Sequence, residues 1–111
     1  MLDFESEVIH AMNERIAQSF LDLLILLELR REGALDDDDI IARIQNKFQL
    51  TKKPESALSV LDLLEKNELI MKRQAERARI YALTDKGLET ANTLLNLRDK
   101  ILGLFLNMLT G

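Results

Sequence analysis

Lysine and arginine side chains, which can bind phosphates, are concentrated in the middle of this 111-residue chain. Residues 43–86 contain ten basic and six acidic residues, a net charge of +4, whereas residues 1–42 contain three basic and eleven acidic residues, a net charge of −8. The remaining residues are neutral overall, and the whole chain carries −4. Binding responds to the local field rather than to the total charge. The middle segment can therefore attract a polyanion such as a nucleic acid.

Four consecutive aspartates, at positions 36–39, suggest either a cation site or the start of a helix. Adjacent carboxylates attract Mg²⁺ or Ca²⁺, but a calcium loop alternates its ligands and contains a glycine, and this segment does neither. As a helix start, Asp36 would be the N-cap and the next three carboxylates would face the positive end of the helix dipole. Leu35 would then pack against Ile40. We predict a helix that begins here and runs to Leu50, and no metal site.

The residue types needed for catalysis are sparse. The chain has no cysteine, so it lacks a thiol nucleophile, a thiolate metal ligand and a disulfide. His10 is the only histidine, and we expect it to be exposed or to pack rather than to act as a base. The four glycines are scattered, so no glycine-rich loop can hold a phosphate. We predict no enzymatic activity and no cofactor.

A helix is predicted over residues 54–67, within the basic region. Pro54 suits its first position, where the missing N–H costs nothing. Ser56, Ser59 and Asp62 fall on its outer side. Apolar residues recur at helical spacing on the side expected to face the core, namely Leu58, Val60, Leu61 and Leu64.

Two short strands and a second helix follow. Residues 69–71 and 80–83 have strand composition, and the polar segment 72–79 joins them. Thr84 is expected to cap the helix that comes next. A helix, a ribbon with a basic tip and a capped helix form the layout of a winged helix-turn-helix, which places one helix in a DNA groove while the ribbon contacts flanking phosphates.

This layout assigns roles to eight polar residues. We expect Ser56 and Ser59 to approach base edges in the groove. Phosphate contacts are expected from Lys52, Lys53, Lys72, Arg73, Arg77 and Arg79. The alternative for the basic residues is a solvated surface that binds nothing.

Both ends of the chain are predicted to form helices that dimerise. Apolar residues recur at helical spacing within residues 1–18, and the sequence leaves open whether this helix continues into the next one or whether Ser19 begins a new helix. Gly33 is expected to end the helical stretch that follows. Residues 87–111 are predicted to form one long helix with two adjacent apolar stripes, more than a domain of this size can cover. A second copy of the chain is the simplest partner. The residues expected at the dimer interface are Val8, Met12, Leu94, Leu97, Ile101, Leu104, Phe105 and Met108.

Three segments of the chain resemble the PadR-like winged-helix transcriptional regulators. Residues 19–26 are similar to that family's first helix, and residues 54–70 to its recognition helix. Residues 79–87 are similar to its ribbon return and its Tyr-x-Leu-Thr-x-Lys-Gly ending. The resemblance implies a mainly α fold with a small β-ribbon (α+β), a winged-helix DNA-binding core over residues 19–86, and long terminal dimerisation helices.

The chain also departs from that family's pattern. Residues 37–39 are aspartates where the family has His-Gly-Tyr, Leu58 replaces a common tyrosine, and Glu68 replaces a glycine. Glu55 and Asp62 are acidic on the side expected to face DNA. These acidic residues favour an alternative hypothesis, in which the winged fold binds a partner protein and has weak or no DNA binding.

The main hypothesis is a homodimeric transcriptional regulator that binds an inverted-repeat site in double-stranded DNA through the helix 54–67 and the basic wing 72–79. The residues do not identify an effector, either small molecule or protein. No segment has the layout of a signal peptide, and no apolar stretch is long enough to span a bilayer. We therefore expect a cytoplasmic protein without membrane contact.

Overall fold

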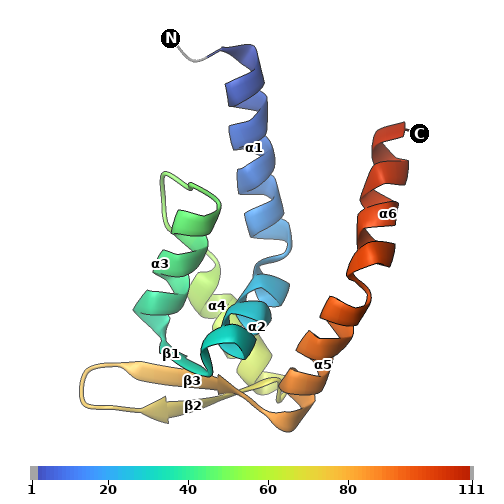
Figure 1. Ribbon diagram of the computed structural model, residues 1–111. Helices are drawn as coiled ribbons and strands as arrows, with labels where there is room; N and C mark the ends of the chain where they lie inside the picture. The colour runs from blue at the N-terminus through green and yellow to red at the C-terminus, as the bar shows by residue number, and fades with distance from the viewer. Residues whose placement is uncertain (1–2, 111) are drawn as a thin grey trace.

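The computed structural model describes residues 3–110, which form six helices and a three-stranded antiparallel sheet (Figure 1). The elements follow in the order α1 (Phe4–Ser19), α2 (Leu21–Glu32), β1 (Ala34–Asp36), α3 (Asp37–Lys47), α4 (Ala57–Lys66), β2 (Ile70–Gln74), β3 (Arg79–Leu83), α5 (Asp85–Asn96) and α6 (Arg98–Thr110). The predicted mainly α fold with a small β-ribbon is confirmed. Residues 1–2 and 111, at the ends of the two predicted dimerisation segments, lie outside the described residues.

The sheet has the order β1-β3-β2, with β3 in the centre. Tyr81 of β3 pairs with Leu35 of β1 on one side and with Lys72 of β2 on the other. The β2–β3 hairpin extends beyond the helices as the wing (Figure 1), and its loop is closed by the Ala75 amide, which donates to the Ala78 carbonyl at 2.8 Å. The sequence predicted β2 and β3 but not β1, because three residues are too few to show a strand pattern.

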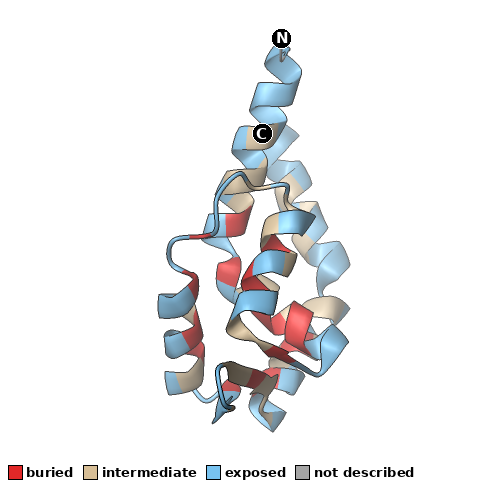
Figure 2. Cartoon of the chain, turned by 90° about the vertical axis from the view of Figure 1, so that its left-hand side faces the viewer, coloured by how far each residue is buried: buried red, intermediate tan, exposed pale blue. Residues whose placement is uncertain are grey.

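The core surrounds α2, which contacts α3, α4, α5 and the sheet. Figure 2 shows that the buried residues lie within the lower body of the molecule, away from the ends of α1 and α6. The largest fully buried side chains are Leu21, Ile25, Leu26, Leu29, Ile40, Ile44, Leu61, Ile70 and Tyr81. Burial of each aliphatic side chain in this set contributes about 1.5–3 kcal/mol to the free energy of folding. Because α2 supplies four of these side chains and contacts both α3 and α4, the positions of α3 and α4 depend on it.

One charged side chain among the described residues is buried in this body, that of Glu28 in α2. Its carboxylate is 2.5 Å from Arg31 Nη2 and 3.7 Å from Lys47 Nζ. The two cations compensate its charge, as burial of a carboxylate requires, so Arg31 and Lys47 are engaged within the fold.

Local hydrogen bonds set three of the helix ends, as the sequence predicted. Asp36 Oδ1 accepts from the Asp39 amide at 2.7 Å and begins α3, and Thr84 Oγ1 accepts from the Gly87 amide at 3.0 Å and begins α5. Gly33 ends α2 with a φ of +87°, a conformation that glycine adopts without strain. The aspartate run is thus the start of a helix, although α3 ends at Lys47 rather than Leu50.

The helix predicted over residues 54–67 begins three residues later than expected. The Pro54 carbonyl accepts from the Ala57 amide at 3.2 Å, which makes residues 54–57 a turn, and the first helical bond runs from the Val60 amide to the Ser56 carbonyl. Pro54 is buried rather than placed in the first turn of the helix. Leu58 was expected in the core, but 49% of it is exposed, because Ala57, Leu61 and Leu64 form the buried side of α4.

The structure answers the question left open at the N-terminus and corrects the prediction for the C-terminus. The N-terminal segment is two helices, α1 and α2, joined at Phe20, and the Ser19 side chain does not cap the second one. The single helix predicted over residues 87–111 is divided at Leu97 into α5 and α6. α1 and α6 extend from the same end of the body (Figure 1). Within residues 3–110, no helix is both long and apolar enough to cross a membrane.

Candidate nucleic-acid interface

The outer side of α4 carries the two serines predicted to contact bases. Burial of Ala57, Leu61 and Leu64 fixes which side of the helix faces outward, and Ser59 and Asp62 are exposed there. Ser56 is exposed at the N-cap position, but its side chain makes no capping hydrogen bond. Both hydroxyls are therefore placed on an accessible side, next to the carboxylate of Asp62.

The C-terminal end of α4 is attached to the junction between the wing and α5. Glu68 has a φ of +63°, and the Leu69 amide donates to the Leu64 carbonyl at 2.9 Å, which ends the helix in a left-handed turn. The Leu69 carbonyl accepts from the Thr84 amide at 3.1 Å, and the Glu68 carbonyl accepts from Thr84 Oγ1 at 2.6 Å. These bonds hold α4 and the wing in a fixed relative position.

Gly87 allows this junction to close. A Cβ atom built on Gly87 would lie 1.8 Å from the Leu69 carbonyl oxygen, a distance that no side chain tolerates. The same glycine ends the Tyr-x-Leu-Thr-x-Lys-Gly motif. Its role here is steric, since the amino-terminal turn of α5 approaches the backbone that follows α4.

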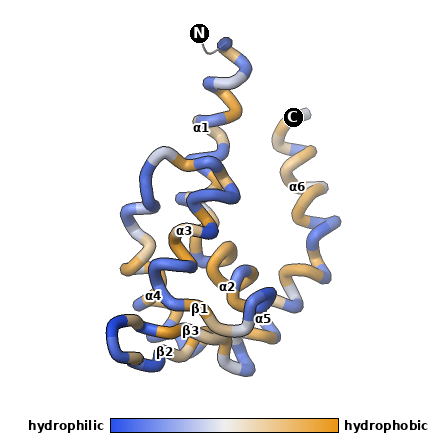
Figure 3. Tube along the Cα trace, turned by 60° about the vertical axis from the view of Figure 1, so that its left-hand side comes forward, coloured by the Kyte–Doolittle hydropathy of each residue, from blue (hydrophilic) through white to orange (hydrophobic). Residues whose placement is uncertain are grey.

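Five of the six predicted phosphate-binding cations are exposed, and four of these five form no ion pair with another described residue. Lys52, Lys53, Arg73 and Arg77 form no ion pair with another described residue, so their charges are available to a ligand. Lys72 differs, because its Nζ is 3.5 Å from Glu65 Oε1 of α4. Figure 3 shows that the wing loop is mostly hydrophilic.

Arg79, the sixth of these cations, is engaged within the protein. Its Nε and Nη2 atoms donate to Asp37 Oδ2 at 3.2 and 2.9 Å. The hydrogen bond to Asp37 is the main cause that raises the pKa of the Arg79 guanidinium. Asp37 is a partner that the sequence did not indicate, because the two residues are 42 positions apart.

Tyr81 lies in the core next to this ion pair. Its hydroxyl is buried and has no hydrogen-bond partner among the described residues. Burial is the main cause that raises the pKa of Tyr81. The phenol therefore stays neutral and serves the packing of the sheet.

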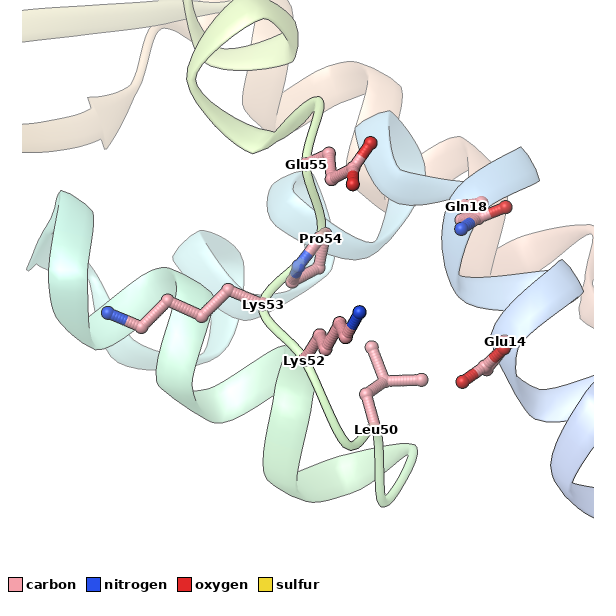
Figure 4. Close-up of a pocket in the computed structure, with 7 residues that line it drawn as sticks. All are labelled: Glu14, Gln18, Leu50, Lys52, Lys53, Pro54 and Glu55. Atoms are coloured by element: carbon pink, nitrogen blue, oxygen red, sulfur yellow. The ribbon is translucent and has the colours of Figure 1, made fainter.

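Lys52 and Lys53 belong to the segment that leads into α4, and they point in different directions. Lys52 and Lys53 both line a pocket of about 180 Å³ between this segment and α1, together with Glu14, Leu50 and Glu55. In Figure 4 the Lys52 ammonium points toward the α1 side of this pocket, whereas Lys53 extends away from it toward α3. Both residues are exposed, and the Lys53 ammonium lies on the α3 side, away from the carboxylates of Glu14 and Glu55.

The eight predicted dimerisation residues form two groups. Leu94, Ile101 and Phe105 line an open apolar groove of about 420 Å³ between α2 and the α5–α6 pair. In this groove the Phe105 and Phe20 rings meet edge to face, with centroids 6.0 Å apart. The others are exposed on α1 and around α6, namely Val8, Met12, Leu97, Leu104 and Met108.

Most of α6 is uncovered. None of its described residues is buried, and Leu104 is 69% exposed although its helix is largely apolar (Figure 3). Such a contiguous apolar surface is unusual on a monomeric protein. The groove and α6 together form an apolar face on one end of the molecule.

No protein-family model matches the chain, and no curated protein sequence is significantly similar to it. Solved structures do match. A PadR-like transcriptional regulator from Bacillus cereus superposes with a TM-score of 0.70 at 19% identity, covering 87% of this chain and 98% of that one. A winged-helix DNA-binding protein from STIV superposes with a TM-score of 0.62 at 18% identity, covering 74% and 91% of the two chains.

Bacillus subtilis PadR, solved in complex with operator DNA, matches with a TM-score of 0.57 at 26% identity. The match covers 68% of this chain and 46% of that one, so this chain corresponds to less than half of the longer regulator. These likenesses confirm the resemblance drawn from residues 19–26, 54–70 and 79–87 at the level of the fold. The chain is a winged helix-turn-helix protein with the architecture of the PadR-like transcriptional regulators.

Proposed function

We propose that the protein is a homodimeric DNA-binding transcriptional regulator. The observation that carries the proposal is the combination of an exposed outer side on α4 with the uncompensated charges of Arg73 and Arg77 in the adjoining wing. A helix presented in this way fits the major groove, while a basic wing fits the flanking phosphates.

The proposed DNA contacts are of two kinds. Ser56 and Ser59 are the side chains placed to reach base edges, and their hydroxyls can donate to or accept from any base. Lys53, Arg73 and Arg77 supply charge to the phosphates, which contributes affinity but no sequence preference. Lys52 is a weaker phosphate candidate, since its ammonium points toward the α1 side of the pocket, where Glu14 lies.

The apolar face supports the dimer. Two copies related by a two-fold axis would cover the exposed side of α6 and the groove between α2 and α5–α6. The exposed apolar residues of α1 would extend this contact. Two recognition helices in such a dimer would lie about 34–36 Å apart, one turn of duplex, so the preferred site would be an inverted repeat. Regulation of transcription follows from the occupation of such a site.

Fluorescence anisotropy with a labelled mixed-sequence duplex, measured over a salt series, tests the DNA contacts. Affinity should fall with salt with a log–log slope of about −0.9 for each phosphate contacted. Arg77→Ala and Lys53→Ala should each reduce the slope by roughly one unit per protomer. Lys100→Ala removes an exposed, unpaired cation from α6 and is the matched control, for which we expect no change. No binding to any duplex at low salt would contradict the proposal.

Sedimentation tests the dimer. Ile101→Asp together with Leu104→Asp should give monomers or aggregates, because two carboxylates would enter the apolar contact. Asn107→Asp, which adds one charge at an exposed position of the same helix, should remain dimeric. A wild-type chain that sediments as a compact monomer at micromolar concentration would rule out the dimer.

The second candidate function is a protein-interaction module with weak or no DNA binding. Glu55 and Asp62 favour it, because both carboxylates are exposed beside the serines and would repel phosphates. Asp62→Asn separates the two functions. A DNA-binding protein should bind duplex more tightly after this change, whereas an interaction module should remain unable to bind it.

A further inference from the structure

The ion pair between Asp37 and Arg79 connects the first turn of α3 to the base of the wing. Arg79 is the first residue of β3 and pairs in register with Gln74, the last residue of β2, so its backbone lies where the wing loop begins. Both of its donating nitrogens approach the same Asp37 oxygen. The other Asp37 oxygen accepts from the Asp38 amide at 3.1 Å, so the carboxylate is held in place from two directions.

The exposure of the two side chains is unequal. The Asp37 side chain is 15% exposed, whereas 38% of the Arg79 side chain is accessible. A partly buried carboxylate that loses its cation is destabilised. The guanidinium, in contrast, can still be reached by a ligand.

DNA bound in the proposed way would bring phosphates close to this pair. In a helix-turn-helix the helix before the recognition helix, here α3, crosses the DNA backbone, while the wing contacts phosphates next to the major groove. Arg79 sits between these two elements. A phosphate and Asp37 therefore offer the same guanidinium the same kind of charge-assisted hydrogen bond.

We propose that Asp37 is an internal competitor of DNA, which retains the Arg79 guanidinium and so prevents it from binding a phosphate at the base of the wing. The inference rests on the proposed DNA-binding function. Transfer of Arg79 to a phosphate would leave the Asp37 carboxylate unpaired and close to the negative backbone, so the exchange yields no net gain in free energy. Asp37 thus lowers the affinity of the protein for DNA.

A double-mutant cycle tests this proposal. The salt dependence of binding to a fluorescein-labelled mixed-sequence duplex is measured from about 50 to about 200 mM salt for the wild type, Asp37→Asn, Arg79→Gln and the double variant. Asparagine keeps an oxygen that can accept from the Asp38 amide but carries no charge to retain the guanidinium. Asp38→Asn is the matched control, because Asp38 lies in the same turn, loses the same charge and pairs with no cation in the described chain.

Asp37→Asn should make the slope more negative by about 0.9 per protomer and tighten binding at low salt by about tenfold per protomer. Arg79→Gln alone should leave the wild-type slope unchanged, since Arg79 makes no phosphate contact while Asp37 retains it. The double variant should return to the wild-type slope, and Asp38→Asn should keep it.

Two results would overturn the inference while leaving the DNA-binding function intact. The first is an Asp37→Asn slope equal to that of the wild type. The second is weaker binding by Asp37→Asn or Arg79→Gln with an unchanged melting temperature, which would mean that the pair positions the wing for binding. If neither the wild type nor any variant binds duplex at low salt, the proposed function itself fails.

Discussion

Replacement of Gly87 by alanine tests how the wing is joined to α4. The added methyl group would be 1.8 Å from the Leu69 carbonyl oxygen, and Cβ atoms essentially never approach another atom closer than 3.0 Å. The α5 turn and Leu69 must therefore separate by at least 1.2 Å. This movement would strain the hydrogen bond that Leu69 accepts from the Thr84 amide and the one that Glu68 accepts from Thr84 Oγ1.

The expected cost follows from these two effects. Forcing an extra methyl group into a packed site costs about 1–3 kcal/mol, and each weakened hydrogen bond about 1 kcal/mol. A total of about 3–5 kcal/mol is a large part of the roughly 5–15 kcal/mol that stabilises a typical domain. For a domain of about 100 residues we expect the melting temperature to fall by roughly 10–20 °C.

Circular dichroism melts at one fixed protein concentration measure this effect, because the stability of a dimer depends on concentration. Gly103→Ala is the matched control. Gly103 lies inside α6, no atom is within 4 Å of a Cβ built there, and alanine should stabilise the helix by up to about 1 kcal/mol. If Gly87→Ala melts within two or three degrees of the wild type, the close approach at Leu69 does not constrain the fold and the explanation of the glycine is wrong.

Three further substitutions are expected to change the free energy of unfolding, measured by urea denaturation. Glu68→Gly should stabilise the protein by about 0.5–1 kcal/mol, because Glu68 has a φ of +63°; a loss of stability would contradict this. Asp36→Ala should cost about 0.5–2 kcal/mol through loss of the cap on the Asp39 amide, and a melting temperature that rises by many degrees with added Mg²⁺ or Ca²⁺ would instead support a cation site. Tyr81→Phe should be neutral or stabilising, since it removes a buried hydroxyl without a partner; a cost above about 1.5 kcal/mol would show that the hydroxyl is hydrogen-bonded in solution.

The parts of the fold that local interactions determine could be predicted from the sequence. Asp36, Thr84 and Gly33 act on backbone groups within a few residues, so their effect is visible in a short segment. The wing strands were recognisable because apolar residues border a polar loop. The same holds for the exposed serines of α4, whose outward side follows from the periodicity of its neighbours.

The features that were missed depend on contacts between distant segments. The buried side of α4 is set by how α2 packs against it, which placed Leu58 outside the core. The start of α4 moved to Ala57 because Pro54 is buried within a turn. The pairing of Arg79 with Asp37 depends on β3 lying beside the first turn of α3, and no local pattern reports that proximity. The departure at Glu68 falls, in contrast, on a single backbone position, whose φ of +63° lies in the left-handed region that favours glycine.

The central claim, that α4 and the wing form the DNA-binding face, is tested most directly by NMR. A mixed-sequence duplex is titrated at low salt into uniformly ¹⁵N-labelled protein, and the changes in amide chemical shift are assigned along the chain. We predict that the largest changes fall in residues 52–62 and 72–79, and that they disappear at high salt. Changes confined to α1 and α6, or no changes at any DNA concentration, would contradict the account.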